Sequence, residues 1–288
     1  ISVGYKVGFA VPRKDVAIEL FERFKNIFIS NKVRLVCGGH SSFLYGDLVI
    51  LTTHQLYRYD HFFDLLVLDE VDAFPFKGNS VLISFFERSL KGHYVMMSAT
   101  PDYKTLKDFK ERGGKVLTLF SRFHKHQMPI PQVKIVNKFF MIPCLIKVLK
   151  SMLNNNKQVL IFTPTIDLCE STYFVLKLFI KQSGSFVHSK KEDREKVINN
   201  FKVKKYSYLV TTAVLERGVT IKDLQVIVFH AEHSLYDQYS LVQISGRVGR
   251  KKDAPEGEVV YIATTNTKSI ESSIRDIETA NKDLQNMF

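Results

Sequence analysis

One short run, LLVLDEVD at positions 65–72, constrains the fold of this chain more than any other part of its sequence. Its four apolar residues predict a β-strand buried on both faces, which is typical of parallel sheets covered by helices. The carboxylates of Asp69, Glu70 and Asp72 follow directly, and carboxylates this close together repel one another. Their clustering therefore indicates a role, such as binding Mg²⁺ and orienting a water molecule. A strand followed by a solvated acidic turn remains the alternative.

Segments typical of strands and segments typical of helices alternate along the chain, which predicts α/β layers with parallel sheets. The expected strands are 7–11, 33–37, 48–52, 65–69, 94–98 and 116–119, followed by 159–163, 186–188, 208–212, 226–230 and 259–263. The expected helices are 15–28, 79–90 and 103–111, followed by 141–153, 167–181, 191–201, 235–247 and 268–280. The segment 122–131 has two prolines and two histidines but lacks the periodic pattern of a helix or strand, so it predicts a connection between domains. We therefore expect a first domain at 1–122, a linker at 123–134 and a second domain at 135–288.

The composition excludes several classes of protein and favours an anionic partner. The chain has 288 residues, of which 45% are apolar, so it can bury sizeable cores. No apolar run reaches the length of a membrane span. Cys37, Cys144 and Cys169 are far apart and odd in number, which argues against a disulfide framework or a zinc site and for a reducing, cytoplasmic location. The formal net charge of +12 favours a polyanionic partner such as nucleic acid.

Three further segments extend the pattern that begins with the acidic run. They are YVMMSATP at 94–101, YLVTTAVLERGV at 208–219 and QISGRVGR at 243–250. In order and spacing, the four segments resemble motifs II, III, V and VI of the superfamily 2 helicases and translocases, and the resemblance covers nearly the whole chain. It implies two tandem RecA-like domains with parallel sheets and a cleft between them, an ATP-dependent activity, and the cofactors ATP and Mg²⁺.

The resemblance also implies roles for residues near the nucleotide. Asp69 is expected to bind Mg²⁺ through water, and Glu70 to orient the attacking water and accept its proton. Gln243, Arg247 and Arg250 stand at i, i+4 and i+7, so we expect them on one face of a helix, with both arginines as arginine fingers. The remaining expected residues couple the motifs (Asp72, Ser98 and Thr100) or lie near the nucleotide (Glu216, Arg217 and Gly218). Ordinary turn hydrogen bonds and a basic helix end are the alternative interpretations.

A second set of residues, at predicted strand ends, resembles the nucleic-acid motifs of the superfamily. The residues are Pro12, Arg13, Gly38, Gly39, Thr53 and His54 in the first domain, and Thr163, Thr165, Thr211 and Thr212 in the second. Small hydroxyl side chains and exposed backbone amides bind phosphates without reading bases, so the set predicts a track for a single strand. Taken singly, each residue is more often a helix cap. Thr220 replaces an Asp that many relatives carry after Gly218, which leaves a ribose contact open.

The sequence around the acidic run resembles one family within this superfamily. TTHQL at 52–56 leads into FDLLVLDEVDAFPF at 63–76, and these segments are similar to the ComFA family of late competence proteins. The segments 122–131, 161–165 and 215–220 resemble that family as well. The resemblance implies an ATP-dependent translocase that draws single-stranded DNA into the cytoplasm during natural transformation. It also implies action at the inner face of the membrane, together with other DNA-uptake proteins.

One motif of the superfamily is missing from the sequence. No Gly-x-x-x-x-Gly-Lys-Ser/Thr occurs, and Gly113-Gly114-Lys115 has the wrong spacing and is followed by Val116. We therefore expect a first domain truncated at its N-terminus and, for this chain alone, negligible ATP hydrolysis. Two further hypotheses remain. One is a nucleic-acid-binding or regulatory module without hydrolysis, and the other is an RNA helicase of the same superfamily, because phosphate contacts do not distinguish the sugars.

Overall fold

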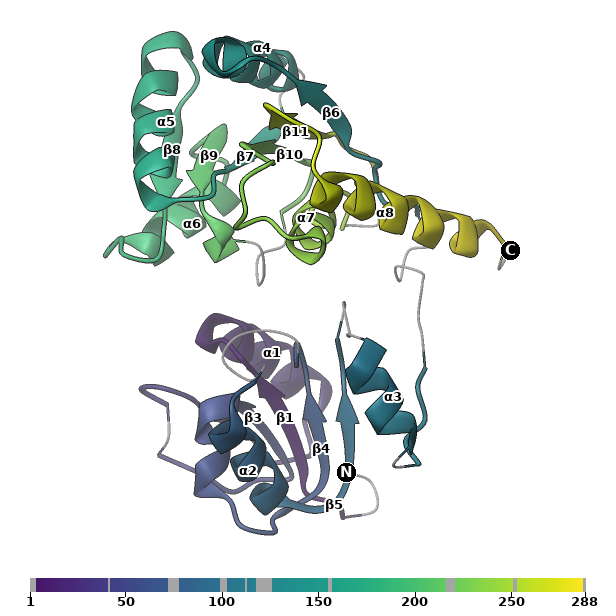
Figure 1. The fold of residues 1–288 in the computed structure, drawn as a ribbon. Coiled ribbons are helices and arrows are strands. Elements are labelled where there is room, and N and C mark those ends of the chain that lie inside the picture. Colours follow the sequence, from purple (N-terminus) through teal and green to yellow (C-terminus); the bar gives the residue numbers. More distant parts are fainter. Residues whose placement is uncertain are drawn as a thin grey trace. The chain divides into compact units, whose positions relative to one another are not determined.

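The computed structural model describes residues 4–40, 42–71, 78–98, 103–111, 113–117, 126–154, 157–215, 221–250 and 253–286. Its contacts divide the chain into two compact units, Ile1–Val116 (unit 1) and Leu117–Phe288 (unit 2). Each unit is a parallel β-sheet with helices packed against it (Figure 1). No helix in the described part of the chain is long and apolar enough to cross a membrane. The domain boundaries expected at 122 and 134 stay a prediction.

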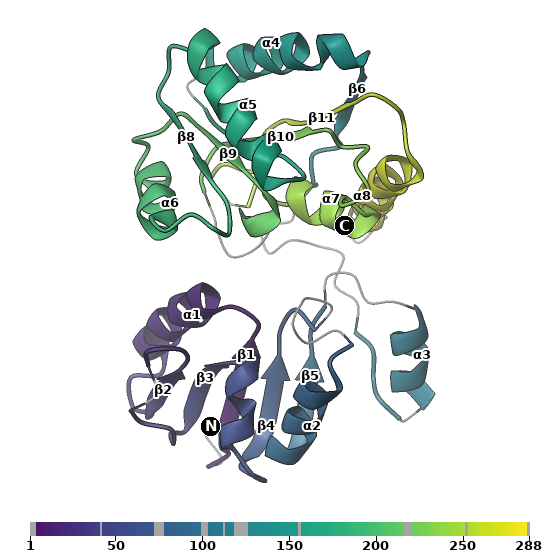
Figure 2. The ribbon, with the colours of Figure 1, turned by 60° about the vertical axis from the view of Figure 1, so that its left-hand side comes forward.

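Unit 1 is built on five parallel strands in the order β2-β3-β1-β4-β5. The strands are β1 (Val7–Val11), β2 (Val33–Val36), β3 (Leu48–Thr52), β4 (Phe63–Leu68) and β5 (Leu90–Met96). The helices are α1 (Lys14–Ile27), α2 (Ser80–Ser89), α3 (Tyr103–Glu111) and the short η1 (Thr53–Arg58). β3 is buried along its whole length, because its sequence LVILT presents apolar side chains to both faces. α1 packs on one face of the sheet, and α2 and η1 pack on the other (Figure 2).

Unit 2 is built on six parallel strands in the order β6-β11-β10-β7-β9-β8. The strands are β6 (Gln132–Ile135), β7 (Gln158–Phe162), β8 (Gly184–Val187), β9 (Tyr208–Thr211), β10 (Leu224–Phe229) and β11 (Val259–Ala263). The helices are α4 (Met141–Asn154), α5 (Ile166–Phe179), α6 (Arg194–Lys202), α7 (Gln238–Ser245) and α8 (Lys268–Asn286), with short turns η2 (Lys138–Phe140) and η3 (Ala213–Leu215).

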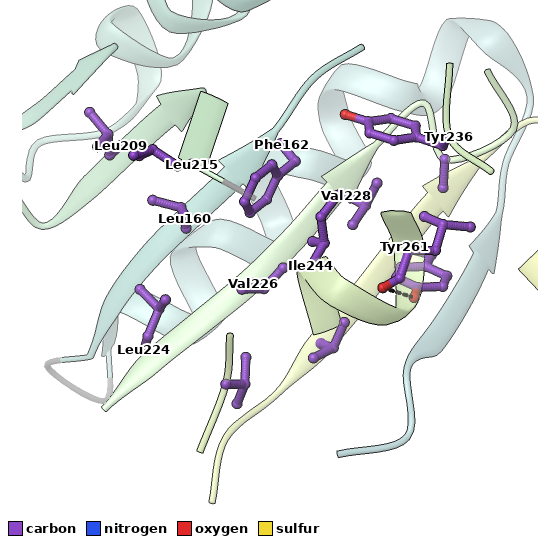
Figure 3. Packing of buried hydrophobic residues seen from close by; sticks show 14 of the residues in the cluster. Leu160, Phe162, Leu209, Leu215, Leu224, Val226, Val228, Tyr236, Ile244 and Tyr261 are labelled. Atoms are coloured by element: carbon purple, nitrogen blue, oxygen red, sulfur yellow. Dashed lines mark hydrogen bonds between the residues drawn. The ribbon is translucent and has the colours of Figure 1, made fainter. Parts of the chain in front are cut away.

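The central strands of unit 2 divide their side chains between two cores. Leu160 and Phe162 of β7 lie in the same core as Val226 and Val228 of β10, and Ile244 of α7 packs there as well (Figure 3). The residues between them belong to a second core under α4 and α5. Side chains of these fully buried strands alternate between the two faces of the sheet, and this alternation determines which helices cover which face. It therefore also fixes where the ends of the strands and the following loops lie.

The predicted α/β class with parallel sheets is confirmed by the structure. Most expected elements occur within a few residues of their predicted bounds. The helix expected at 235–247 is shorter than predicted, and β6, partly within the expected linker, was not foreseen. β6 has four residues and is partly exposed, so its sequence QVKI carries little apolar signal. Of the strand expected at 116–119, residues 116 and 117 lie outside any strand, and 118 and 119 lie outside the described residues.

Candidate nucleotide and nucleic-acid sites

The polar residues expected in a site gather at one edge of each sheet. In unit 1 they follow the carboxyl ends of all five strands, and in unit 2 they follow β7 and β9. Because every strand of a sheet is parallel to its neighbours, these ends meet at a single edge. Ligands of open parallel sheets bind at that edge. The two edges therefore contain the candidate sites, one in each unit.

The acidic end of β4 is held firmly between its two neighbouring strands. Asp69 N donates to Ala10 O at 2.9 Å, and Val71 N donates to Met97 O at 3.2 Å, which extends the pairing with β1 and β5. Between them, Glu70 has φ +53°, a left-handed conformation that is costly for a residue with a side chain. The Asp69 Oδ1 accepts a hydrogen bond from Glu70 N at 2.9 Å. The backbone thus fixes two half-buried carboxylates at the end of the strand.

The donors at this edge fit Mg²⁺ better than an ion that needs a full protein cage. Mg²⁺ usually keeps several waters and takes one or two carboxylates together with phosphate oxygens. Asp69 and Glu70 supply such carboxylates. Ser98 lies half-buried just beyond β5. The expected coupling residues Asp72 and Thr100 lie outside the described residues.

A glycine turn follows β2 at the same edge of unit 1. Cys37 and His40 exchange two backbone hydrogen bonds with N–O distances of 2.9 and 2.8 Å, so Gly38 and Gly39 form an exposed tip. Gly39 has φ +83°, which favours glycine. The Lys14 Nζ lies 3.8 Å from the position that a Cβ of Gly39 would occupy. The turn therefore combines exposed backbone with a lysine, and such an arrangement attracts phosphate.

The neighbouring Arg13 is already engaged by an acidic residue. Its Nε and Nη2 donate to the two carboxylate oxygens of Asp15 at 3.1 and 2.8 Å. Lys14, which the sequence analysis did not single out, is exposed beside the glycine turn. Its charge also opposes the burial that raises the pKa of the Cys37 thiol. The sequence shows Lys14 only as the neighbour of Arg13, and its closeness to Gly39 comes from the fold.

The residues after β3 differ from each other in accessibility. Thr53 is 1% exposed, and no group among the described residues hydrogen-bonds its hydroxyl. His54, the next residue, is exposed. Pro12, after β1, is half-buried. A contact of Thr53 with a phosphate would therefore have to use the backbone, whereas His54 can use its side chain.

In unit 2, the expected threonines use their hydroxyls within the protein. The buried Thr163 donates to Thr211 O at 3.2 Å, and Thr211 donates to Thr212 O at 3.0 Å. Thr165 caps α5, because its hydroxyl accepts from Leu168 N at 3.3 Å. The helix-cap interpretation thus describes the Thr165 side chain. Phosphate binding by these residues stays a prediction, and it would have to use the backbone or the half-buried Thr212.

Two further polar pairs at the edge of unit 2 were not identified from the sequence. The His188 Nε2 lies 2.8 Å from Glu170 Oε1, with the histidine side chain 7% exposed. The Glu232 Oε1 lies 3.1 Å from His230 Nδ1 and accepts from Thr264 Oγ1 at 3.0 Å. His188, His230 and Thr264 each follow directly on a strand, which was the available signal. Their acidic partners come from other parts of the chain or the next loop, so the pairs could not be foreseen.

The segment 243–250 departs from the helix that was expected there. α7 ends before Gly246, which is its C-cap, so Arg247 and Arg250 lie beyond the helix. The prediction that Gln243, Arg247 and Arg250 share one helix face is therefore wrong. The chain instead turns, and Gly249 adopts φ +68° within the turn.

The two arginines of this turn have different surroundings. Arg247 is only 2% exposed, and its N donates to Ile244 O at 3.1 Å. Arg250 is exposed, and its Nε donates to Gly246 O at 3.0 Å. The latter contact satisfies a carbonyl at the end of α7, as the basic-helix-end alternative predicts. A charge held in a buried position, as for Arg247, interacts more strongly with an anion than one in water does. The arginine-finger role of both residues stays a prediction.

Three residues expected near the nucleotide, Glu216, Arg217 and Gly218, lie outside the described residues, as does Thr220.

Comparisons with known proteins bear on both units. Residues 141–252 match the family model of the helicase conserved C-terminal domain. The structure resembles S. cerevisiae Dbp5 bound to RNA and ADP BeF3, with a TM-score of 0.73 and 18% identity over 97% of this chain and 76% of that chain. It also resembles Mycobacterium smegmatis helicase Lhr bound to ssDNA and AMP-PNP, with a TM-score of 0.67 and 16% identity over 96% of this chain and 42% of that chain. These likenesses confirm the predicted tandem RecA-like fold.

Two curated relatives narrow the family. Competence protein ComFA of Streptococcus pneumoniae is 34% identical over 98% of this chain and 68% of the relative. Competence protein ComFA of Bacillus subtilis is 31% identical over 98% of this chain and 63% of the relative. The chain thus spans about two thirds of the length of these relatives. The chain belongs to the ComFA family of competence proteins, as the sequence around its acidic segment predicted.

Proposed function

We propose that this chain is the motor part of an ATP-dependent translocase that moves single-stranded DNA during DNA uptake. The observation that carries the proposal is the gathering of acidic, basic and glycine residues at the carboxyl edge of one parallel sheet in unit 1. That edge contains both an acidic end suited to hydrolysis and a basic turn suited to phosphate. The match of unit 2 to the helicase C-terminal domain supports the same function.

The acidic end of β4 supplies the chemistry of hydrolysis in this proposal. Asp69 would hold Mg²⁺, which when bound would offset the negative charge of the phosphates. Glu70 orients the attacking water and accepts its proton. The hydrogen bonds of the Asp69 and Val71 backbone amides hold the backbone that carries both carboxylates, so little free energy is spent in ordering that backbone. The family resemblance extends the proposal to the buried Arg247 of unit 2, as a positive charge for a phosphate group.

The basic side of the same edge supplies the grip on DNA. In this proposal, Lys14 and the Gly38-Gly39 turn contact one backbone phosphate, and Arg13 contacts a phosphate that competes with Asp15 for the guanidinium. Such contacts position a strand without reading its sequence. The net charge of +12 strengthens binding at low salt. Other DNA-uptake proteins at the inner face of the membrane are the partners that this function requires.

The substitution Glu70→Gln tests the proposal in a chain extended at its N-terminus by a segment that carries the Gly-x-x-x-x-Gly-Lys-Ser/Thr motif. It removes proton acceptance but keeps the shape of the side chain. We expect loss of DNA-stimulated ATP hydrolysis with unchanged affinity for single-stranded DNA, measured by phosphate release and by fluorescence anisotropy. Loss of DNA binding together with activity would show that the acidic end has a structural role. Stimulation by RNA and not by DNA would favour the RNA helicase alternative.

A further inference from the structure

The side chain of Asn281 on α8 holds the backbone of Met128. Met128 N donates to Asn281 Oδ1, and Asn281 Nδ2 donates to Met128 O, each at 2.8 Å. The two residues are 153 positions apart in the sequence. Met128 lies four residues before β6, in the segment that leads into the sheet of unit 2. A side-chain amide suits this contact because it offers both a donor and an acceptor.

Asn281 occupies a position on α8 where packing alone would favour an apolar residue. The buried residues of the helix form one stripe, which consists of Ile270, Ser273, Ile277, Asn281 and Leu284. Asn281 is 7% exposed, and burial of an amide is unfavourable unless its hydrogen bonds are made. The cost is offset only while Met128 is in place. The residue therefore specifies where the entering segment lies, which a leucine could not do.

The same stripe of α8 reaches the end of α7. Ser273 lies eight positions before Asn281, beside the hydroxyl of Tyr261 on β11. That hydroxyl is 2.7 Å from the hydroxyl of Ser245, the last residue of α7. The turn that contains Arg247 follows directly. α8 is one continuous helix of 19 residues, so Asn281 and Ser273 belong to the same element.

We propose that Asn281 is a positioning residue that fastens the segment entering unit 2 to α8 and, through α8, steadies the turn of Arg247. The clamp is the pair of hydrogen bonds between Asn281 and Met128, and its transmission along α8 is the proposed step. Only the benefit to nucleotide chemistry rests on the proposed function. The clamp makes the position of the entering segment and the order of the arginine turn depend on each other.

Hydrogen exchange of backbone amides, measured by NMR on the 288-residue chain, tests the inference. Asn281→Leu removes both hydrogen bonds and keeps the volume. We expect exchange at the Met128 amide to accelerate about tenfold or more. A tenfold acceleration corresponds to a loss of about 1.4 kcal/mol in the free energy of local opening. The amides of Arg247 and Val248, which bond Ile244 and Ser245 carbonyls, should exchange severalfold faster. The β10 amides should not change, and Asn286→Leu, at the exposed end of α8, should change none of them.

A second variant supplies a pH-dependent rescue that a merely structural role would not show. In Asn281→Asp, a carboxylate still accepts from Met128 N but repels the Met128 carbonyl, so one of the two hydrogen bonds is lost, whereas a protonated carboxyl again offers one donor and one acceptor. The protection factor of the Met128 amide should therefore be intermediate while the carboxyl is ionised and should recover further as the pH falls through the pKa of that carboxyl, whereas Asn281→Leu should show no recovery.

Four results would overturn the inference. They are unchanged exchange at Met128, acceleration confined to Met128, acceleration that includes β10 and therefore reports general destabilisation, and no recovery of Asn281→Asp at low pH. None of these readouts involves ATP or DNA. Failure of the clamp and failure of the proposed function are therefore separate results.

Discussion

Removing the acidic partner of Arg13 should tighten the binding of single-stranded DNA. The Asp15 carboxylate accepts from both Nε and Nη2 of the guanidinium in an exposed pair, so Asp15→Asn removes a negative charge that competes with phosphate for Arg13. One added phosphate contact steepens the dependence of log affinity on log salt by roughly 0.7. This corresponds to an affinity increase of about fivefold at about 0.1 M salt, falling to about threefold at about 0.2 M.

The same substitution should lower stability, which separates the two effects. Asp15 lies in the first turn of α1, where its charge interacts favourably with the helix dipole by about 0.3–1 kcal/mol. The exposed ion pair adds at most about 1 kcal/mol. We therefore expect a small loss in the free energy of unfolding together with the gain in affinity. A substitution that acted only through folding could not raise the affinity for DNA while lowering the free energy of unfolding.

Fluorescence anisotropy with an oligo-dT strand across a salt series measures the affinity, and urea unfolding measures the stability. Glu19→Gln is the matched control, because it removes the same charge from the same helix and removes the ion pair with Arg23. The two acidic side chains are similarly exposed, Glu19 at 41% and Asp15 at 44%. The control should leave the salt slope unchanged. If both substitutions raised the affinity for DNA equally, the change in net charge would explain the result. If Asp15→Asn left the affinity unchanged, the placement of Arg13 on the DNA path would be refuted.

Two further predictions follow from buried groups. Thr53→Val should raise the free energy of unfolding by about 1–2 kcal/mol without weakening DNA binding, because it removes a buried hydroxyl that lacks a partner among the described residues. Thr172→Val, on α5, is the control and should give a similar gain in the free energy of unfolding for the same reason. A fall in DNA affinity with Thr53→Val but not with Thr172→Val would show that the Thr53 hydroxyl contacts a phosphate. Burial raises the pKa of Cys169 from its ordinary value of 9.0 to about 11 and that of Tyr261 to about 12, so the native state keeps protons that the unfolded chain loses. Stability should therefore decline as the pH rises above about 9, and Cys169→Ala should lessen the first part of that decline, to which Cys37 and Cys144 also contribute, in urea midpoints measured across pH.

The sequence contained enough information to predict the sheets and the edge of each sheet at which the candidate residues lie. Runs such as LVILT in β3 are apolar on both faces, so they predict buried strands and, by alternation with helices, parallel pairing. Parallel pairing then predicts that Asp69 and Gly38 lie at the same edge. These inferences need only local patterns together with a general rule of topology.

The remaining features depend on contacts between distant residues or on local geometry that the pattern disguises. The spacing of Gln243, Arg247 and Arg250 fits a helix, but the chain leaves the helix at Gly246 and Gly249 turns it. The closeness of Lys14 to Gly39 exists only once β1 and β2 are in one sheet. The spacing of residues in the sequence does not predict such features.

The binding of single-stranded DNA by the 288-residue chain tests the central claim most directly. An anisotropy titration would compare oligo-dT with a mixed-sequence strand of the same length across a series of salt concentrations. Phosphate contacts at the basic edge release counterions, so log affinity should fall linearly with log salt at roughly −0.7 per contact, with the same slope for both strands. Binding that is independent of salt, or that strongly prefers one sequence, would contradict a phosphate track at the carboxyl edges of these sheets.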